Sequence, residues 1–232
     1  MPIEIRASQV GQFLSCQRAF YYNSILGLKD VKSKASDRGD KLHKLFADRA
    51  KRGEKPLKII PSAYSYLSVE NTVRIKFKNI ILRGTVDLLA IDTRNNELVI
   101  IDYKTCNMDT FRRRVDLEGF IEYDSQLLTY VALTLGSVEA LTEYKPGIRV
   151  AHCYVERGSG KGLLYREGKP DLQTRTLHYS RLHNIADYFD IGEQAFTKAM
   201  ATKNSAICSK YGGCPFLKTC MLSPNQSAKP GF

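Results

Sequence analysis

The sequence predicts an α/β fold in which a central mixed β-sheet is flanked by helices. Residues 37–51 place apolar side chains at helical spacing. Between residues 73 and 105 the pattern changes to alternating and then continuous apolar segments, which is typical of strands. Helical spacing returns at residues 122–135. Because the strand segments are apolar on both sides, we expect them in the middle of a sheet that helices cover on both faces.

Helical segments are also expected at the two ends of the chain. Ser8 is the expected N-cap of the first helix, in which Val10 and Phe13 begin an apolar stripe. The helix at 37–51 should end at the RGEKP motif, because glycine and proline terminate helices. Apolar residues at helical spacing between 182 and 200 predict a long final helix.

Four strands are expected, at residues 73–77, 80–92, 98–105 and 148–155. Lys78-Asn79 and residues 94–96 are the expected turns between the first three strands. The GSGKG sequence at 158–162 should form a hairpin loop. It does not match the phosphate-binding loop motif, since Val155 replaces the first glycine and no Ser or Thr follows Lys161.

The composition favours a polyanionic partner and gives no sign of a membrane protein. The chain has 35 Lys and Arg against 24 Asp and Glu, a formal net charge of +11, which favours nucleic acid or an acidic membrane surface. No apolar run reaches the roughly 20 residues of a membrane-spanning helix. The N-terminus lacks the pattern of a secretory signal. We therefore expect no membrane insertion, and a cytoplasmic location.

No internal repeat and no linker divides the sequence. Residues 1–222 are therefore expected to form a single domain. The polar segment at residues 223–232, which contains Pro and Gly, is expected to be a disordered tail.

Three charged residues lie in the otherwise apolar strands. Asp102 and Lys104 are two residues apart on one strand, so their side chains should share a face. Asp87 lies on the preceding strand. If Asn95-Asn96 closes a two-residue hairpin, Asp87 is opposite Lys104 and diagonal to Asp102. A loop two residues longer would keep all three on one face.

Two carboxylates and an amine in an apolar sheet can form a hydrolytic metal site. Asp87 and Asp102 supply the hard oxygen ligands that Mg2+ and Mn2+ prefer. Such a metal stabilises charge on a phosphodiester and lowers the pKa of an attacking water. Lys104 would orient that water or stabilise developing charge. A structural ion pair at a sheet edge is the alternative that the same spacing allows.

The blocks GTVDLLAI, IDYKT and QLLTY resemble the RecB-like branch of the PD-(D/E)XK nuclease superfamily, which includes CRISPR-associated and phage exonucleases. The resemblance extends from about Ser8 to Cys220, with the blocks in the family's order. It implies a restriction-endonuclease-like core and a DNA exonuclease acting on single-stranded ends, in recombination, repair or CRISPR-type DNA processing. Recombination or CRISPR adaptation proteins are then the expected partners. A catalytically weak DNA-binding or assembly module with the same fold is the alternative.

The resemblance also implies roles for individual residues. Asp87 and Asp102 match the metal-binding acids, and Lys104 matches the catalytic lysine. Gln126 and Tyr130 match the family's Gln-x-x-x-Tyr helix, and a spacing of four residues puts both on one helical face.

A further metal ligand is implied upstream of the strands. His43, in RGDKLHKLF, matches the histidine that this branch uses as an additional ligand. A structural or solvated histidine is the alternative for a lone helical His. Gly39, one turn earlier, would allow another segment to approach the helix backbone closely.

The six cysteines are expected to be thiols or metal ligands rather than disulfides. Cys208, Cys214 and Cys220 have equal five-residue gaps that suit a metal centre, and Cys16 is the best candidate for a fourth ligand. The resemblance implies a [4Fe-4S] cluster that joins N- and C-terminal helical segments. A structural zinc site and free thiols are the alternatives.

A basic run follows the third strand. Arg112, Arg113 and Arg114 could bind phosphates without reading the base sequence. A solvated surface run is the alternative.

Overall fold

The computed structural model describes residues 2–28, 34–109, 111–112, 121–143, 147–190, 204, 216 and 220. The strands are β1 Ile3–Arg6, β2 Tyr64–Phe77, β3 Ile80–Asp92, β4 Glu97–Cys106, β5 Ile148–Glu156 and β6 Gly162–Gly168. The helices are α1 Ala7–Ser15, α2 Gln17–Phe20, α3 Lys34–Lys51, α5 Ser125–Leu135 and α6 Leu172–Asp190, with short helical turns at Tyr21–Ile25, Ile121–Tyr123 and Glu139–Leu141. In the described part of the chain, no helix is long and apolar enough to cross a lipid bilayer.

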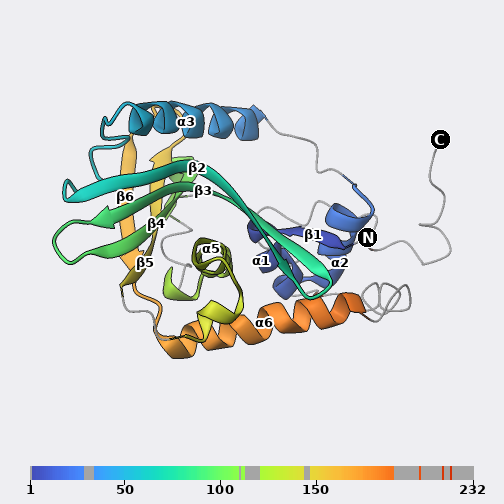
Figure 1. Cartoon of the computed structure of the whole chain (residues 1–232). Helices are drawn as coiled ribbons and strands as arrows, with labels where there is room; N and C mark the ends of the chain where they lie inside the picture. Colours follow the sequence, from blue (N-terminus) through green and yellow to red (C-terminus); the bar gives the residue numbers. More distant parts are fainter. Residues whose placement is uncertain are drawn as a thin grey trace.

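The sheet is mixed, and helices cover both of its faces. The strand order is β1-β3-β4-β5-β6, and β2 pairs with β3 as well. The β1–β3 and β4–β5 pairs are parallel and the others antiparallel. Figure 1 shows α3 over one face, and α5 and α6 over the other. This arrangement confirms the predicted α/β class with a central mixed sheet between helices.

The apolar core has two parts, one on each side of the sheet. The part beneath α3 includes Phe46 and Ile101. The part beneath α5 and α6 includes Ile100, Val131 and Ile185. Neighbouring residues Ile100 and Ile101 thus face opposite layers, as the alternation of side chains along a strand requires. This explains why the β4 sequence is apolar on both sides.

The first strand was not predicted, and the first helix begins earlier than expected. Strand β1 pairs in parallel with the start of β3, from Ile3 opposite Ile80. The helix begins at Ala7, so Ser8 is not its N-cap; the Arg6 backbone N–H instead donates to Gln9 Oε1 at 2.8 Å. A strand of four residues has too little pattern to be recognised, because its stability comes from the β3 edge to which it bonds.

One edge of β3 is shared by two strands. Because β2 pairs with β3 along its whole length, β1 and β4 lie together on the opposite edge. There β1 pairs with residues 80–83 and β4 with residues 88–92. Residues 84–87 pair with neither strand, so a gap opens in the middle of the sheet. Asp87 is the last residue of this gap.

Helix α5 is buried between the sheet and α6, which explains its apolar sequence. It begins at the Asp124 N-cap, whose Oδ1 accepts a hydrogen bond from Leu127 N at 2.9 Å, and it ends at Gly136 in the left-handed conformation, with φ of +82°. Thr129 Oγ1 donates to Ser125 O and lies 3.0 Å from His178 Nε2 on α6. A buried polar contact therefore links the two helices.

We predict that His178 makes stability depend on pH. Burial, with a smaller effect of the Arg181 charge, lowers the pKa of His178 to about 3 from a usual value of 6.5. Between these values the unfolded chain binds a proton and the folded chain does not. The free energy of unfolding should therefore fall as the pH drops below 6.5, by at most about 1.4 kcal/mol per pH unit.

Urea unfolding of the wild type and of His178→Gln at pH 7 and pH 5 measures this contribution. The glutamine can still donate to Thr129 but cannot gain a proton. The free energy of unfolding of the wild type should fall more between pH 7 and pH 5 than that of the variant. A difference in stability between the two proteins that is the same at both pH values would contradict the prediction.

Candidate active site

The loop between β3 and β4 is longer than the predicted hairpin. Asp92 pairs with Glu97, so the loop contains four residues, two more than an Asn95-Asn96 hairpin would have. Asp92 stabilises this wider turn, since its Oδ1 accepts from Arg94 N at 3.1 Å and its carbonyl accepts from Asn96 N at 2.8 Å. The register moves by two residues. Asp87 is therefore in line with Asp102 rather than with Lys104.

The Asp87 carboxylate replaces the backbone ladder at the point where β3 and β4 separate. The last backbone pair is Leu88 with Ile101. One residue further on, Asp87 Oδ2 accepts a hydrogen bond from Tyr103 N at 2.8 Å. Its other oxygen, Oδ1, lies 3.3 Å from His43 Nδ1 on α3. The carboxylate thus connects both strands to the helix above them.

Two close contacts hold α3 against β4 near this carboxylate. The rings of His43 and Tyr103 meet edge to face, with centroids 5.7 Å apart. A Cβ atom on Gly39 would lie 2.9 Å from Thr105 Oγ1. Gly39 therefore permits the close backbone approach, and Tyr103, which the sequence did not single out, orients the imidazole.

A second group of polar side chains lies on the α5 side of β4. Gln126 is at its centre, because its Oε1 accepts from Lys104 Nζ at 2.8 Å and its Nε2 donates to Asp102 Oδ1 at 3.0 Å. Its Nε2 also lies 2.9 Å from the Tyr130 hydroxyl. Lys104 Nζ is 2.8 Å from Asp102 Oδ2. The structure therefore brings Asp102, Lys104, Gln126 and Tyr130 into one network.

The charges at this site are strongly coupled. Burial raises the pKa of Asp87, the His43 hydrogen bond lowers it and the Asp102 charge raises it; the net shift is upward. Burial alone would lower the pKa of Lys104, but Asp102 raises it above its ordinary value. In the metal-free site this direction favours the ammonium form of Lys104. Burial alone would also lower the pKa of His43, but the hydrogen bond and charge of Asp87 outweigh burial and raise this pKa.

The residues at the gap suit a divalent cation. Asp102 is 4% exposed, and the Asp87 side chain is 14% exposed. Each negative charge destabilises the other, and a cation held by both oxygens would relieve that repulsion. Within the described residues, no three His, Cys, Asp or Glu side chains already surround a common point. His43 and Lys104 instead contact the two carboxylates, so a cation held by both acids would have to replace these contacts.

A basic cavity of about 320 Å3 adjoins this network and was missed in the sequence. Its lining includes Arg6, Arg83 and Tyr130, from three different elements. Arg83 Nη1 also donates to Glu4 Oε1 at 3.1 Å. Neither arginine belongs to a basic run, which is why composition could not reveal them. Of the predicted basic connector, Arg112 is exposed, and Arg113 and Arg114 lie outside the described residues.

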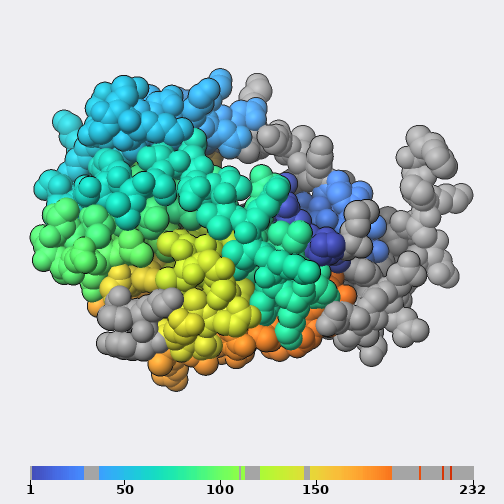
Figure 2. All heavy atoms as spheres, in the orientation of Figure 1, coloured from blue at the N-terminus to red at the C-terminus, as the bar shows by residue number. Residues whose placement is uncertain are grey.

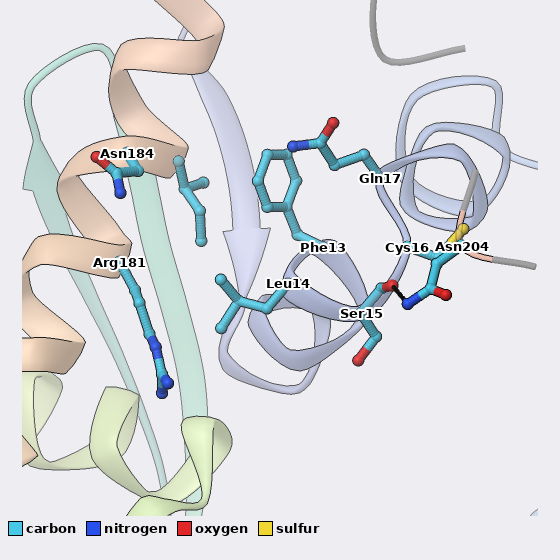
Figure 3. A pocket seen from close by; sticks show the side chains of 9 residues that line it. Phe13, Leu14, Ser15, Cys16, Gln17, Arg181, Asn184 and Asn204 are labelled. Atoms are coloured by element: carbon cyan, nitrogen blue, oxygen red, sulfur yellow. Dashed lines mark hydrogen bonds between the residues drawn. The ribbon is translucent and has the colours of Figure 1, made fainter. Parts of the chain in front are cut away.

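Described residues of the C-terminal segment contact the N-terminal helices near Cys16. Asn204 Nδ2 donates to Ser15 O at 3.1 Å, beside a cavity of about 380 Å3 that Cys16 also lines (Figure 3). Arg18 Nη1 lies 3.5 Å from Cys220 Sγ. The space-filling view in Figure 2 shows the N-terminal elements beside α6 on one side of the molecule. Cys208, Cys214 and the tail at 223–232 lie outside the described residues.

The chain is similar to several solved structures. The crystal structure of SSO0001 is 18% identical, with a TM-score of 0.49, and the match covers 96% of this chain and 86% of that one. The crystal structure of LHK-Exo in complex with dAMP is 14% identical, with a TM-score of 0.49, and the match covers 84% and 93% of the two chains. An alkaline exonuclease structure, LHK-Exo from Laribacter hongkongensis, is 14% identical, with a TM-score of 0.45, over 81% and 91%. No curated protein sequence matches.

The family is established by a match over most of the chain. The family model of the PD-(D/E)XK nuclease superfamily matches residues 55–221. This range contains β2 to β6 and α5, and therefore both the gap beside Asp87 and the Gln126 network. The chain belongs to the PD-(D/E)XK nuclease superfamily.

Proposed function

We propose that this chain is a metal-dependent deoxyribonuclease that hydrolyses phosphodiester bonds at the ends of single-stranded DNA. The proposal depends mainly on the arrangement of Asp87, Asp102 and Lys104 where β3 and β4 separate. Gln126 is hydrogen-bonded to both Asp102 and Lys104 there. Nucleases of this superfamily typically use Mg2+ or Mn2+. The preference for single-stranded ends is supported by the resemblance to RecB-like exonucleases. The same resemblance supports recombination or CRISPR adaptation proteins as partners.

Each residue of the proposed active site has a distinct role in this reaction. Asp87, Asp102 and His43 would hold the Mg2+ or Mn2+ ion. When bound, this ion stabilises charge on the phosphate and lowers the pKa of the attacking water. Lys104, as an ammonium ion, stabilises the negative charge that develops on the phosphate oxygens. Gln126 holds the Lys104 ammonium beside Asp102, and its hydrogen bond with Tyr130 fixes its own position.

The reaction itself is a substitution at phosphorus. A bond forms between phosphorus and the water oxygen, and the bond between phosphorus and the leaving sugar oxygen breaks. The water loses a proton to solvent, and the leaving oxygen gains one. The basic cavity with Arg6 and Arg83 supports binding of the DNA backbone, since such contacts are independent of sequence.

We also propose that residues 1–222 form one nuclease domain whose ends are joined by a [4Fe-4S] cluster on Cys16, Cys208, Cys214 and Cys220. The contacts of Asn204 and Cys220 with the N-terminal helices support a meeting of the two ends. Zinc on the same four thiolates is the alternative. The cluster would have a structural role and would take no part in hydrolysis.

Substitution of Lys104 tests the proposed activity. Lys104→Met keeps the unbranched chain up to the position of Cε but removes the charged amine, so cleavage of labelled single-stranded DNA should fall about 10²- to 10³-fold. EDTA should abolish cleavage by the wild type, and Mg2+ or Mn2+ should restore it. The matched control is Lys169→Met, which removes an exposed lysine that pairs with Glu97 at 2.5 Å; this variant should cut at the wild-type rate. A wild type without cleavage in either metal would favour the DNA-binding module instead.

A methyl group at Gly39 should disturb the site without touching its ligands. Gly39→Ala would collide with Thr105 and push α3 away from β4, so the cleavage rate should fall about tenfold or more. Helix propensity favours alanine by about 1 kcal/mol, so stability should not fall in parallel. The second substitution Thr105→Ala removes the colliding oxygen and should restore activity. Gly158→Ala is the control, because a Cβ there meets no atom within 4 Å. Full activity of Gly39→Ala would rule out the positioning role.

The cluster proposal predicts a coloured protein. Anaerobically purified wild type should contain iron and absorb broadly at about 400 nm. Cys16→Ser should lose both the iron and this absorbance. Cys153→Ala is the matched control, because Cys153 is buried on β5 and burial raises the pKa of its thiol to about 12. A colourless protein with one equivalent of zinc would support the zinc alternative, and the absence of both metals would support free thiols.

A further inference from the structure

A buried histidine on β5 lies directly beside the proposed metal-binding strand. His152 is 2% exposed and pairs in the parallel ladder with Asp102. Neighbours in a ladder point to the same face, so the imidazole lies on the α5 side of the sheet with Asp102. No motif in the sequence distinguishes this histidine from one that only packs in the core.

The imidazole faces carboxylates from two different elements. His152 Nε2 is 3.9 Å from Asp102 Oδ2 and 3.9 Å from Asp124 Oδ2. Its other nitrogen, Nδ1, lies 3.4 Å from the Tyr154 hydroxyl. A ring nitrogen that faces two carboxylates is stabilised as an N–H donor, because a lone pair there would be repelled. Nδ1 then accepts from the tyrosine.

The second of these carboxylates begins the helix that carries the polar network. Asp124 caps α5 with its Oδ1, which leaves Oδ2 directed toward His152. Two residues later, Gln126 contacts both Asp102 and Lys104. The His152 side chain therefore lies between the β4 carboxylate and the start of α5, and any tilt of this helix would move Gln126.

Another buried histidine shows what a purely structural contact looks like in this fold. His178 is 0% exposed and also contacts α5, but its nearest polar partner is the neutral Thr129 hydroxyl. It faces none of the acids of the proposed site. His152 differs because the Asp102 carboxylate that it faces belongs to a proposed metal ligand.

We propose that His152 is a positioning residue for the proposed phosphodiester hydrolysis: its Nε2–H dipole attracts Asp102 and the Asp124 cap of α5 over 3.9 Å, a separation longer than a hydrogen bond, and keeps them in register. The inference rests on the proposed function of this site. Removal of a group that orients a metal ligand typically weakens metal affinity or activity by about 10- to 100-fold. DNA binding should change little, since His152 is buried away from solvent.

A pair of amide variants tests the role. The amide nitrogen of His152→Gln can take the place of Nε2, whereas that of His152→Asn reaches only the place of Nδ1. Val150→Ala is the control, because Val150 packs on the same strand and in the α5-side core, and its truncation weakens packing alone. Mn2+ binding to the intact protein is measured by calorimetry, and kcat and KM on single-stranded DNA are measured in parallel.

His152→Asn should weaken Mn2+ binding and lower kcat by about tenfold or more, with KM within about twofold of the wild type. His152→Gln should recover most of both losses, and Val150→Ala should lower only the unfolding midpoint. Equal Mn2+ affinity in the wild type and His152→Asn, or equal losses in both amide variants, would overturn the proposal. If the wild type cleaves no DNA, the proposed function fails, and the Mn2+ affinities still decide whether His152 positions Asp102.

Discussion

The hydrogen bond from Tyr103 N to Asp87 Oδ2 is the interaction on which the rest of the site depends. In a continuous antiparallel pair, a backbone carbonyl would accept this bond. Because β1 and β4 share one edge of β3, the ladder stops at Leu88, and the Asp87 side chain satisfies the Tyr103 donor instead. An acidic side chain is thereby held in the middle of an apolar sheet, where its charge is costly without a counter-ion.

The layers above and below the sheet complete this arrangement from opposite sides. On one side, α3 brings His43 to Asp87, and the close approach at Gly39 sets the distance between helix and strand. On the other side, α5 brings Gln126 to Asp102 and Lys104. Without α3, Asp87 would lose its contact with His43, and without α5, Asp102 would lose its contact with Gln126. The site therefore forms only when both helices pack on the sheet, which couples folding to the proposed chemistry.

The sequence could predict which residues share one face of a strand or helix better than it could predict the register between strands. The period of two along β4 places Asp102 and Lys104 on one face, and the period of helix α5 places Gln126 near Tyr130. The register could not be predicted, because the Asp92 side chain stabilises a wider turn than Asn95-Asn96 suggested. The wider turn shifts the register by two residues, so that Asp87 is in line with Asp102 instead of Lys104.

Residues that act through tertiary contacts could not be predicted. Strand β1 depends on the edge of β3, and Arg6 and Arg83 come together only because these strands pair. His152 lies in an apolar strand with no motif around it, and its neighbours Asp102 and Asp124 are far away in sequence. Such contacts depend on the order of the strands in the sheet, and the periodicity of a single segment does not predict that order.

A crystal structure of the protein soaked with Mn2+, with the metal located by anomalous scattering, would show whether Asp87 and Asp102 bind one metal ion together. We expect an ion coordinated by carboxylate oxygens of both Asp87 and Asp102, with Lys104 still bonded to Gln126. An ion bound elsewhere, with Lys104 and Asp102 still paired and Asp87 bonded only to His43 and Tyr103, would contradict it.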